Sequence, residues 1–163
     1  MTGLATRLDR LYDAYNHEDA ALDPVQIVRR YTRPADQEVI GFCAAALAFG
    51  RVQSVLNTVN GIARVLGPAP AEYVKRFAPQ DPHPELRAMV HRWIRGADIV
   101  ALLWILRQMI DEAGSIEAFF AAGYDPGAED VGEALDRFSR RTIHRRNRFS
   151  RLHALPADGR GKK

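Results

Sequence analysis

The residue types in this chain that are best suited to chemistry are arginines gathered near its C-terminus. Residues 137–163 hold 10 Lys and Arg against one acidic residue, whereas residues 1–136 hold 13 against 19. Clustered arginines are the electrostatic signature of a surface that binds a polyanion. Residues 137–157 contain no acidic residue, so most of these arginines lack a carboxylate one helical turn away. We therefore predict phosphate contacts from five of them: Arg140, Arg141, Arg145, Arg146 and Arg148.

Two further interpretations compete for this arginine-rich segment. Its side chains could pair with the acidic remainder of the domain, in which case the helix is a solvated basic surface. It could also lie on a membrane surface, but the apolar side of such a helix is needed for the core. Phosphate binding fits the sequence better than either of these interpretations.

The stretch of residues 34–51 is the element expected to position a further cation. It opens with acidic residues, which suit the positive end of a helix dipole, and is uncharged from Val39 through Gly50. This pattern predicts a central buried helix that ends at Gly50. Arg51 would then stand at the mouth of a tight turn into the next helix. We expect it either to contact a backbone phosphate or a DNA base, or to be a solvated turn residue.

Other kinds of chemistry find no support in the sequence. The five histidines lack the spacing of metal ligands, and no glycine-rich loop follows a strand. The single cysteine, Cys43, lies in the uncharged stretch and is expected to be a small core residue with an inert thiol. No window reaches the roughly 20 apolar residues of a membrane-spanning helix. We therefore expect no metal, no cofactor and no membrane partner, and a cytoplasmic location.

The apolar spacing predicts an all-α fold, because it recurs every three or four residues and nowhere alternates as in a strand. One helical domain is expected over residues 1–153, followed by a mobile basic tail over residues 154–163. Helices are expected over residues 6–16, 25–33, 34–50, 52–66, 71–76, 99–113 and 116–120. The apolar stripe at residues 86–94 suggests a further helix, and the final helix is expected to run from residue 128 to beyond residue 149.

Several segments resemble one bacterial family of uncharacterised, conserved hypothetical proteins. The segments are DP…V…RY at 23–31, DQEVI…AAALAFGRV at 36–52, RW…GADI at 92–99 and GSIEAFF at 114–120. The resemblance covers most of the chain. That family is in turn similar in outline to the helix–hairpin–helix DNA glycosylases, which implies a single orthogonal multi-helix domain.

The glycosylase resemblance rests on the helix that ends LAFGR, at residues 47–51. In the glycosylases a similar helix leads into a turn whose polar residue reaches DNA beside the extruded base. The resemblance implies that Arg51 occupies this position. The glycosylases use a lysine nucleophile and a downstream aspartate. Lys162 or Lys163 is a candidate for this lysine, and the sequence has no counterpart of the aspartate. We therefore expect a C-terminally truncated chain without a complete catalytic site.

These observations leave three functional hypotheses. The protein could be a DNA glycosylase relative that is active only when completed by further sequence, or a nucleic-acid-binding protein without enzymatic activity. The alternative is a helical protein–protein interaction module whose basic helix docks on an acidic partner. DNA is the expected partner, and the sequence does not indicate an oligomeric state.

Overall fold

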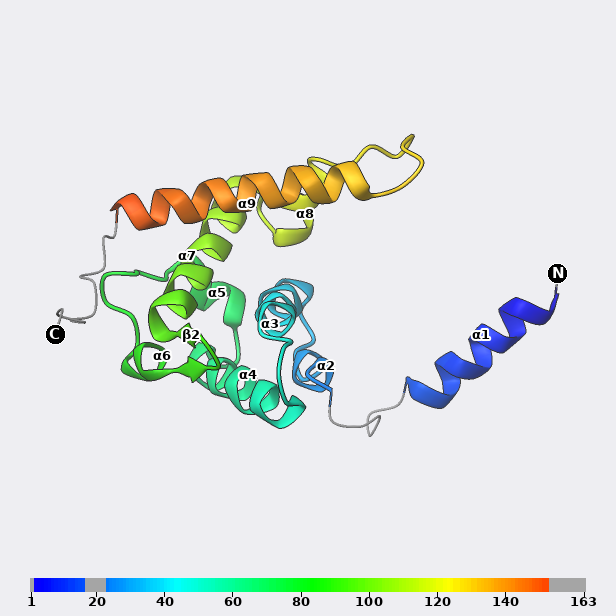
Figure 1. Cartoon of the computed structure of the whole chain (residues 1–163), viewed down its shortest axis with the longest axis horizontal. Helices are drawn as coiled ribbons and strands as arrows, with labels where there is room; N and C mark the ends of the chain where they lie inside the picture. The colour runs from blue at the N-terminus through cyan, green and yellow to red at the C-terminus, as the bar shows by residue number, and fades with distance from the viewer. Residues whose placement is uncertain (1, 17–22, 153–163) are drawn as a thin grey trace, which may run out of the picture.

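The computed structural model describes the backbone of residues 2–16 and 23–152, and the side chains within these ranges from residue 3 to residue 146. It is mostly helical, as the sequence predicts, and contains one small antiparallel hairpin (Figure 1). The elements are α1 Thr2–Tyr15, α2 Val25–Val28, α3 Pro34–Ala46, α4 Val52–Leu66, α5 Pro70–Lys75, α6 Pro84–Ala88, β1 Val90–His91, β2 Ile94–Arg95, α7 Gly96–Ala113, α8 Ile116–Ala121 and α9 Gly132–Leu152.

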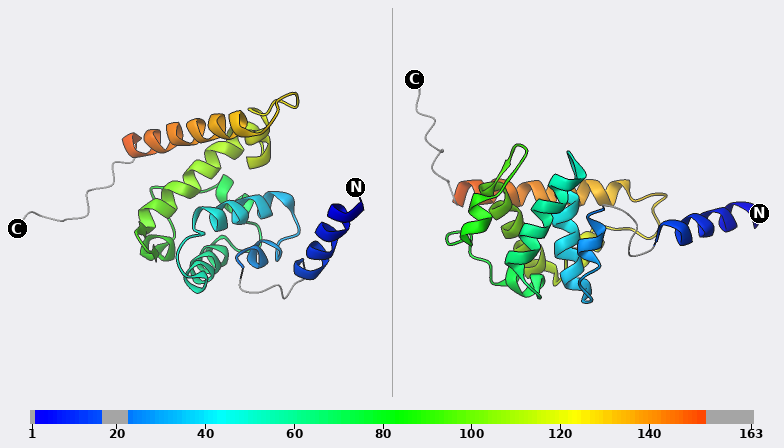
Figure 2. Two further views of the ribbon diagram at one scale, coloured as in Figure 1. Left: turned by 45° about the vertical axis from the view of Figure 1, so that its right-hand side comes forward. Right: turned by 90° about the horizontal axis from the view of Figure 1, so that it is seen from below.

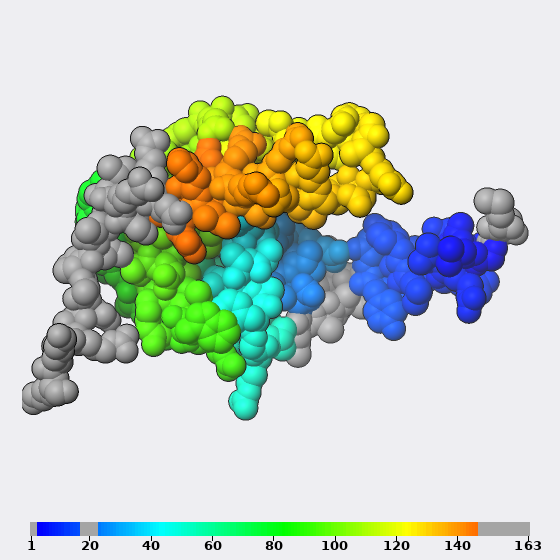
Figure 3. Space-filling model, turned by 45° about the horizontal axis from the view of Figure 1, so that its top comes forward, coloured from blue at the N-terminus to red at the C-terminus, as the bar shows by residue number. Residues whose placement is uncertain are grey.

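A single hydrophobic core holds the helices from α2 to α9 together. Helix α7 packs against α5, α6, α8 and α9, and α3 packs against α2, α4, α5 and α8. Helix α9 runs along one side of this domain, while α1 projects away from it (Figures 1 and 3). The apolar residues of α1, such as Leu8 and Tyr15, are consequently exposed. None of the described helices is long and apolar enough to cross a membrane.

Helix α4 has the bounds that the sequence predicts, whereas α3 ends earlier than expected. Gly67, with a positive φ of 71°, ends α4. Helix α3 stops at Ala46, four residues before Gly50, so the prediction that Gly50 ends it is wrong. The physical reason is that the buried Leu47 leaves the helical path and the chain turns tightly, with the Phe49 amide donating to the Leu47 carbonyl at 2.7 Å. Gly50 instead supplies a φ of 94° at the end of this turn.

The apolar stripe at residues 86–94 does not form the expected helix. Helix α6 ends at Ala88, and the chain continues as the β1–β2 hairpin, in which His91 pairs with Ile94. Two of the apolar residues that suggested a helical face, Val90 and Trp93, are exposed. The chain cannot stay helical here because the first residue of α7 packs against the end of α6, so the residues between the two helices have to turn back. A Cβ on Gly96 would lie 2.0 Å from the Arg87 carbonyl oxygen, so only glycine fits.

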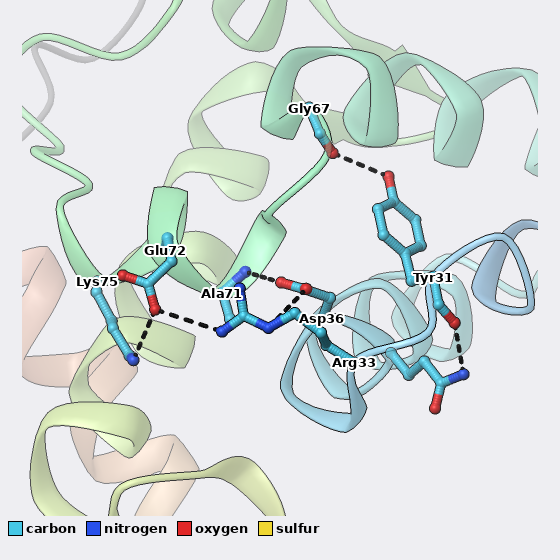
Figure 4. A network of polar contacts seen from close by, with 8 residues as sticks. Tyr31, Arg33, Asp36, Gly67, Ala71, Glu72 and Lys75 are labelled. Carbon is cyan, nitrogen blue, oxygen red and sulfur yellow. Dashed lines mark hydrogen bonds and ion pairs between the residues drawn. The ribbon is translucent and has the colours of Figure 1, made fainter.

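The acidic residues at the start of α3 do more than complement its dipole. Asp36 is 1% exposed, and its Oδ1 accepts a hydrogen bond from the Ala71 amide, 2.9 Å away, in the first turn of α5 (Figure 4). Glu38 Oε2 accepts from the Ile116 amide at 2.7 Å, where α8 begins. Each carboxylate thus satisfies a backbone donor that a helix start leaves without a partner. The sequence pattern that marks α3 also ties α5 and α8 to it.

Around Asp36 a wider polar network joins the same elements. Arg33 bridges Asp36, at 3.7 Å, and Glu72, at 3.8 Å, and Lys75 pairs with Glu72 at 3.0 Å (Figure 4). The Tyr31 hydroxyl donates to the Gly67 carbonyl at 3.2 Å, which joins the end of α4 to the connection between α2 and α3. These contacts are structural. They lie at the interface between helices, and both cations of this network, Arg33 and Lys75, are paired with carboxylates.

Candidate functional site

The predicted phosphate-binding arginines of α9 are mostly engaged in ion pairs. Arg137 pairs with Glu133 and Arg140 with Asp136, at 2.8 Å for the latter, each one turn earlier on the same helix. Arg141 and Arg145 both pair with Glu112 on α7, and the Arg141 Nη2 to Glu112 Oε1 distance is 2.7 Å. The premise that no carboxylate lies one helical turn away is therefore wrong for Arg137 and Arg140, whereas Arg141 and Arg145 find their carboxylate on another helix. Three of the five predicted phosphate contacts, Arg140, Arg141 and Arg145, are thus in ion pairs.

Arg141 and Arg145 are also packed against an aromatic ring. Their guanidinium carbons lie 3.6 Å and 4.4 Å from the centroid of the Phe119 ring, which belongs to α8. Arg141 additionally donates to the Phe119 carbonyl at 2.7 Å. The Arg145 side chain is only 14% exposed. The two arginines, together with Glu112, clamp α9 onto α7 and α8.

The contacts with Arg141 and Arg145 also shift the pKa of the Glu112 carboxyl. The hydrogen bond from Arg141 and the charges of both arginines hold the pKa of the Glu112 carboxyl below its usual range, against the opposing effect of partial burial. The interpretation that basic residues of α9 pair with the acidic remainder of the domain is thus supported for Arg137, Arg140, Arg141 and Arg145. Whether any of them also contacts nucleic acid stays a prediction.

Arg51 occupies the position that the sequence led us to expect, at the entry to α4. It is the residue immediately before Val52, it has extended backbone angles, and it is exposed. Its backbone carbonyl accepts the amides of Ser54 and Val55, at 2.9 and 3.2 Å, so the first turn of α4 fixes its backbone. The side chain is left to project from the turn of residues 47–51.

The β1–β2 hairpin is docked on this turn, which the sequence did not reveal. His91 is 2% exposed, and its two ring nitrogens lie 3.1 Å from the Phe49 carbonyl oxygen and 3.1 Å from the Thr58 hydroxyl. The Phe49 ring also meets the His91 ring edge to face, with centroids 4.8 Å apart. Figure 2 (right) shows the hairpin and the α3–α4 turn projecting side by side from the domain.

The hairpin brings two more arginines and a tryptophan to the turn that carries Arg51. The Arg92 stem lies against Gly50, close enough that a Cβ there would be 3.3 Å from Arg92 Cδ. Trp93 is 67% exposed and stacks on Phe49, with centroids 4.6 Å apart and an interplanar angle of 15°. Arg95 donates to the Arg92 carbonyl at 2.9 Å. We call this surface the turn–hairpin surface; its exposed residues are Arg51, Arg92, Trp93 and Arg95.

The turn–hairpin surface differs from α9 in its electrostatics. In the part of the chain that the structure describes, Arg51, Arg92 and Arg95 form no ion pair. An open apolar groove of about 360 Å³ lies beside the hairpin. Ile94 of β2 and Arg146 of α9 both line the groove, and Asp98 is the one carboxylate among its lining residues. Arg146 therefore lies on the same side of the molecule as the hairpin.

The sequence contained a signal for this surface that our prediction did not use. Residues 92–96 read RWIRG, in which two arginines flank an exposed aromatic residue. The apolar spacing instead places Trp93 in the apolar stripe of the helix expected at residues 86–94. Of the remaining predicted residues, Arg148 has no described side chain, and Lys162 and Lys163 lie outside the described residues.

Other expectations about chemistry can be compared with the structure. Cys43 is fully buried, which confirms it as a core residue, and burial raises the pKa of its thiol to about 12. Among the described residues no group of three His, Cys, Asp or Glu side chains could hold a metal ion. The buried histidine of the site, His91, is occupied by hydrogen bonds to the turn and to α4.

Comparison with known proteins assigns the chain to a family. A family model described as a protein of unknown function (DUF2400) matches residues 23–162, so the chain belongs to this family. Membership of an uncharacterised family is therefore confirmed. The match contains the whole turn–hairpin surface and α9, and it begins after α1. Neither a curated protein nor a solved structure matches the chain.

Proposed function

We propose that this protein binds nucleic acid through the turn–hairpin surface, with Arg51 at its centre. The observation that carries the proposal is the convergence of Arg51, Arg92 and Arg95 on one projection of the domain without an ion pair among the described residues. Guanidinium groups that carry no counter-charge are attracted to phosphates, and the release of condensed counterions then favours binding.

Three features favour nucleic acid over an acidic protein as the partner. The surface is a projection rather than a flat face, so it can enter a groove or approach a strand. An exposed aromatic ring lies among the cations. The ring can stack on a base while the cations attract the phosphates of the same strand. The backbone beneath is fixed by α4 and by the two hydrogen bonds of His91, so little conformational freedom is lost on binding.

We further propose that the protein is related to base-excision DNA glycosylases without carrying a complete catalytic site. The support is the sequence resemblance at residues 47–51, which puts Arg51 where a glycosylase turn reaches the DNA. Lys75 is the one lysine among the described residues, and it is paired with Glu72 on α5. The candidate surface therefore offers no lysine nucleophile of its own within the described chain.

The test compares binding of fluorescein-labelled DNA by the full chain and its variants, followed by fluorescence anisotropy across a salt series. We expect the double variant R51A/R92A to bind roughly tenfold more weakly at low salt and to lose about 1.4–1.8 units of the log–log salt slope. The matched control is R137A/R140A, which also removes two exposed arginines but from ion pairs within α9.

Two results would contradict the proposal. One is the absence of salt-dependent binding to single-stranded or duplex DNA. The other is an equal loss of affinity in R51A/R92A and R137A/R140A, because the turn–hairpin surface would then have no special role. If salt-dependent binding fails but the protein captures an acidic polypeptide through α9, the interaction-module alternative is the better description.

A further inference from the structure

The turn–hairpin surface carries an aromatic pair whose arrangement phosphate binding alone does not require. Trp93 stacks on Phe49 at a centroid distance of 4.6 Å and remains 67% exposed. Phe49 covers one face of the indole, so the opposite face is open to solvent. A hairpin tip in a small domain gains little from a tryptophan that is mostly in water. An aromatic residue held in this way is suited to receive another planar group.

We propose that Trp93, supported from behind by Phe49, is a stacking platform for an unpaired base, so that the surface prefers single-stranded nucleic acid to duplex. This inference rests on the proposed function, since it needs the surrounding arginines to bring a strand to the surface. It adds the substrate class: a strand whose bases are unstacked. In a duplex both faces of an internal base are already covered by neighbouring pairs, so the platform has nothing to receive.

The platform is preorganised by contacts on its protein side. Phe49 is held by the edge-to-face contact of its ring with His91 and by the bond between its carbonyl oxygen and the His91 ring. The turn of the hairpin is fixed at Arg92, which has a φ of 56° and whose carbonyl accepts from Arg95. The indole is therefore stacked on a ring that is itself held in place before a ligand arrives, which lowers the entropic cost of stacking.

The cations around the platform are placed for the backbone of the same strand. Arg92 is next to Trp93 in the chain, and its stem lies against Gly50, the neighbour of Arg51. A groove that combines exposed aromatic rings with cations is the usual arrangement for binding single strands, in which successive bases stack and phosphates meet positive charge. The preference is expected to be tolerant of sequence because every base has a π-face.

The experiment separates stacking from charge by using the full chain with three variants of the hairpin. W93A removes the platform, W93F keeps a smaller aromatic ring, and V90A is the matched control, because Val90 is another exposed apolar residue of the same hairpin. The probes are a labelled oligo(dT) strand and the same strand annealed to oligo(dA). Circular dichroism and urea unfolding establish that each variant is folded.

We expect W93A to weaken binding of the single strand at least about fivefold while leaving the duplex affinity and the salt slope unchanged. W93F should retain most of the affinity, and V90A all of it. A second measurement uses intrinsic fluorescence: the chain has two tryptophans, of which Trp104 is buried, so oligo(dT) should quench the exposed Trp93. This quenching should be lost in W93F although the strand still binds.

The outcomes distinguish this inference from the proposed function. Salt-dependent binding that is equal for strand and duplex, with W93A unchanged, would overturn the stacking platform and leave nucleic-acid binding in place. Binding that is unaffected by R51A/R92A would remove the proposed function itself. Strand binding without quenching of Trp93 would also contradict the platform, and it does so even if W93A fails to fold.

Discussion

Two groups of arginines in this molecule look equivalent in sequence and differ in what surrounds them. Those of α9 are numerous, yet four of the described ones are paired with Glu112, Glu133 or Asp136. Those of the turn–hairpin surface are few, and among the described residues their guanidinium groups form no ion pair, although the Asp98 carboxylate accepts from the Arg95 backbone amide at 2.8 Å. The comparison teaches that the number of arginines in a segment does not measure the charge it can offer to a ligand. What matters is the charge left after pairing within the fold.

The energetic reason is that a carboxylate partner offsets the charge of a paired arginine, and a phosphate that engages the whole guanidinium has to displace that partner. For Arg145 the loss would include its contact with the Phe119 ring as well as the Glu112 carboxylate. For Arg51 and Arg92 a phosphate replaces only water. The same kind of side chain is thus structural in one region and available in the other.

Among the variants that test this comparison, R141A/R145A is expected to have the largest effect on stability. This double variant should lower the free energy of unfolding by about 1–2 kcal/mol, because it removes both ion pairs of Glu112 and both cation–π contacts with Phe119. Urea denaturation followed by circular dichroism measures it. DNA affinity should change less than about twofold when the protein is folded, since the turn–hairpin surface is intact. Full stability with a large loss of DNA binding would reverse the roles we assign to the two regions.

A smaller effect is expected from pH, through Glu112. Its pKa is lower in the folded protein than in the unfolded chain, chiefly because of the Arg141 hydrogen bond. The stabilisation is therefore complete above the unfolded pKa of about 4.3 and is lost as the pH falls through the folded value. E112Q should be less stable than the wild type near neutral pH, and the gap should shrink in acid. Unfolding curves of both proteins across this range measure the gap, which isolates Glu112 from the other carboxyls.

A gap that stayed constant from neutral pH down to about pH 3 would show that the Glu112 carboxylate charge contributes nothing. The clamp of α9 would then consist of packing and backbone contacts alone. The matched control is E133Q, because Glu133 pairs with a single arginine of its own helix and is largely exposed.

The smallest effect is expected from R140A. The Arg140 side chain is 79% exposed and pairs with Asp136 one turn earlier on the helix, an arrangement worth about 0.3–0.5 kcal/mol. We expect a loss of stability of this size and a change in DNA affinity below about twofold. Urea unfolding and anisotropy measure the two quantities. A loss of affinity as large as that of R51A/R92A would place α9 in the interface after all.

The sequence was informative where local patterns decide structure. The bounds of α4 were predicted because its apolar face is continuous and Gly67 ends it. Ser115, a residue type typical of helix N-caps, caps α8 by accepting from the Ala118 amide at 2.9 Å. The mostly helical fold follows from such local signals. Membership of the family was likewise visible in local segments of sequence.

The sequence failed where tertiary contacts decide structure. Residues 86–94 have helical apolar spacing, but two of these apolar residues are exposed, and periodicity cannot distinguish a core face from a binding surface. The partner of Arg141 and Arg145 is Glu112, which lies 29 and 33 residues away in the chain, so no local rule identifies it. The position of Arg51 at the entry to α4 was predictable because a turn between helices is visible in sequence. The stacking of Trp93 on Phe49 was not predictable because the two residues are distant in the chain.

One further consequence comes from the glycine at the base of the hairpin. Because Gly96 touches the Arg87 carbonyl, the two legs of the excursion between α6 and α7 are closed at their root. A side chain at position 96 would force these legs apart, so G96A should displace the hairpin from the α3–α4 turn on which His91 and Trp93 pack.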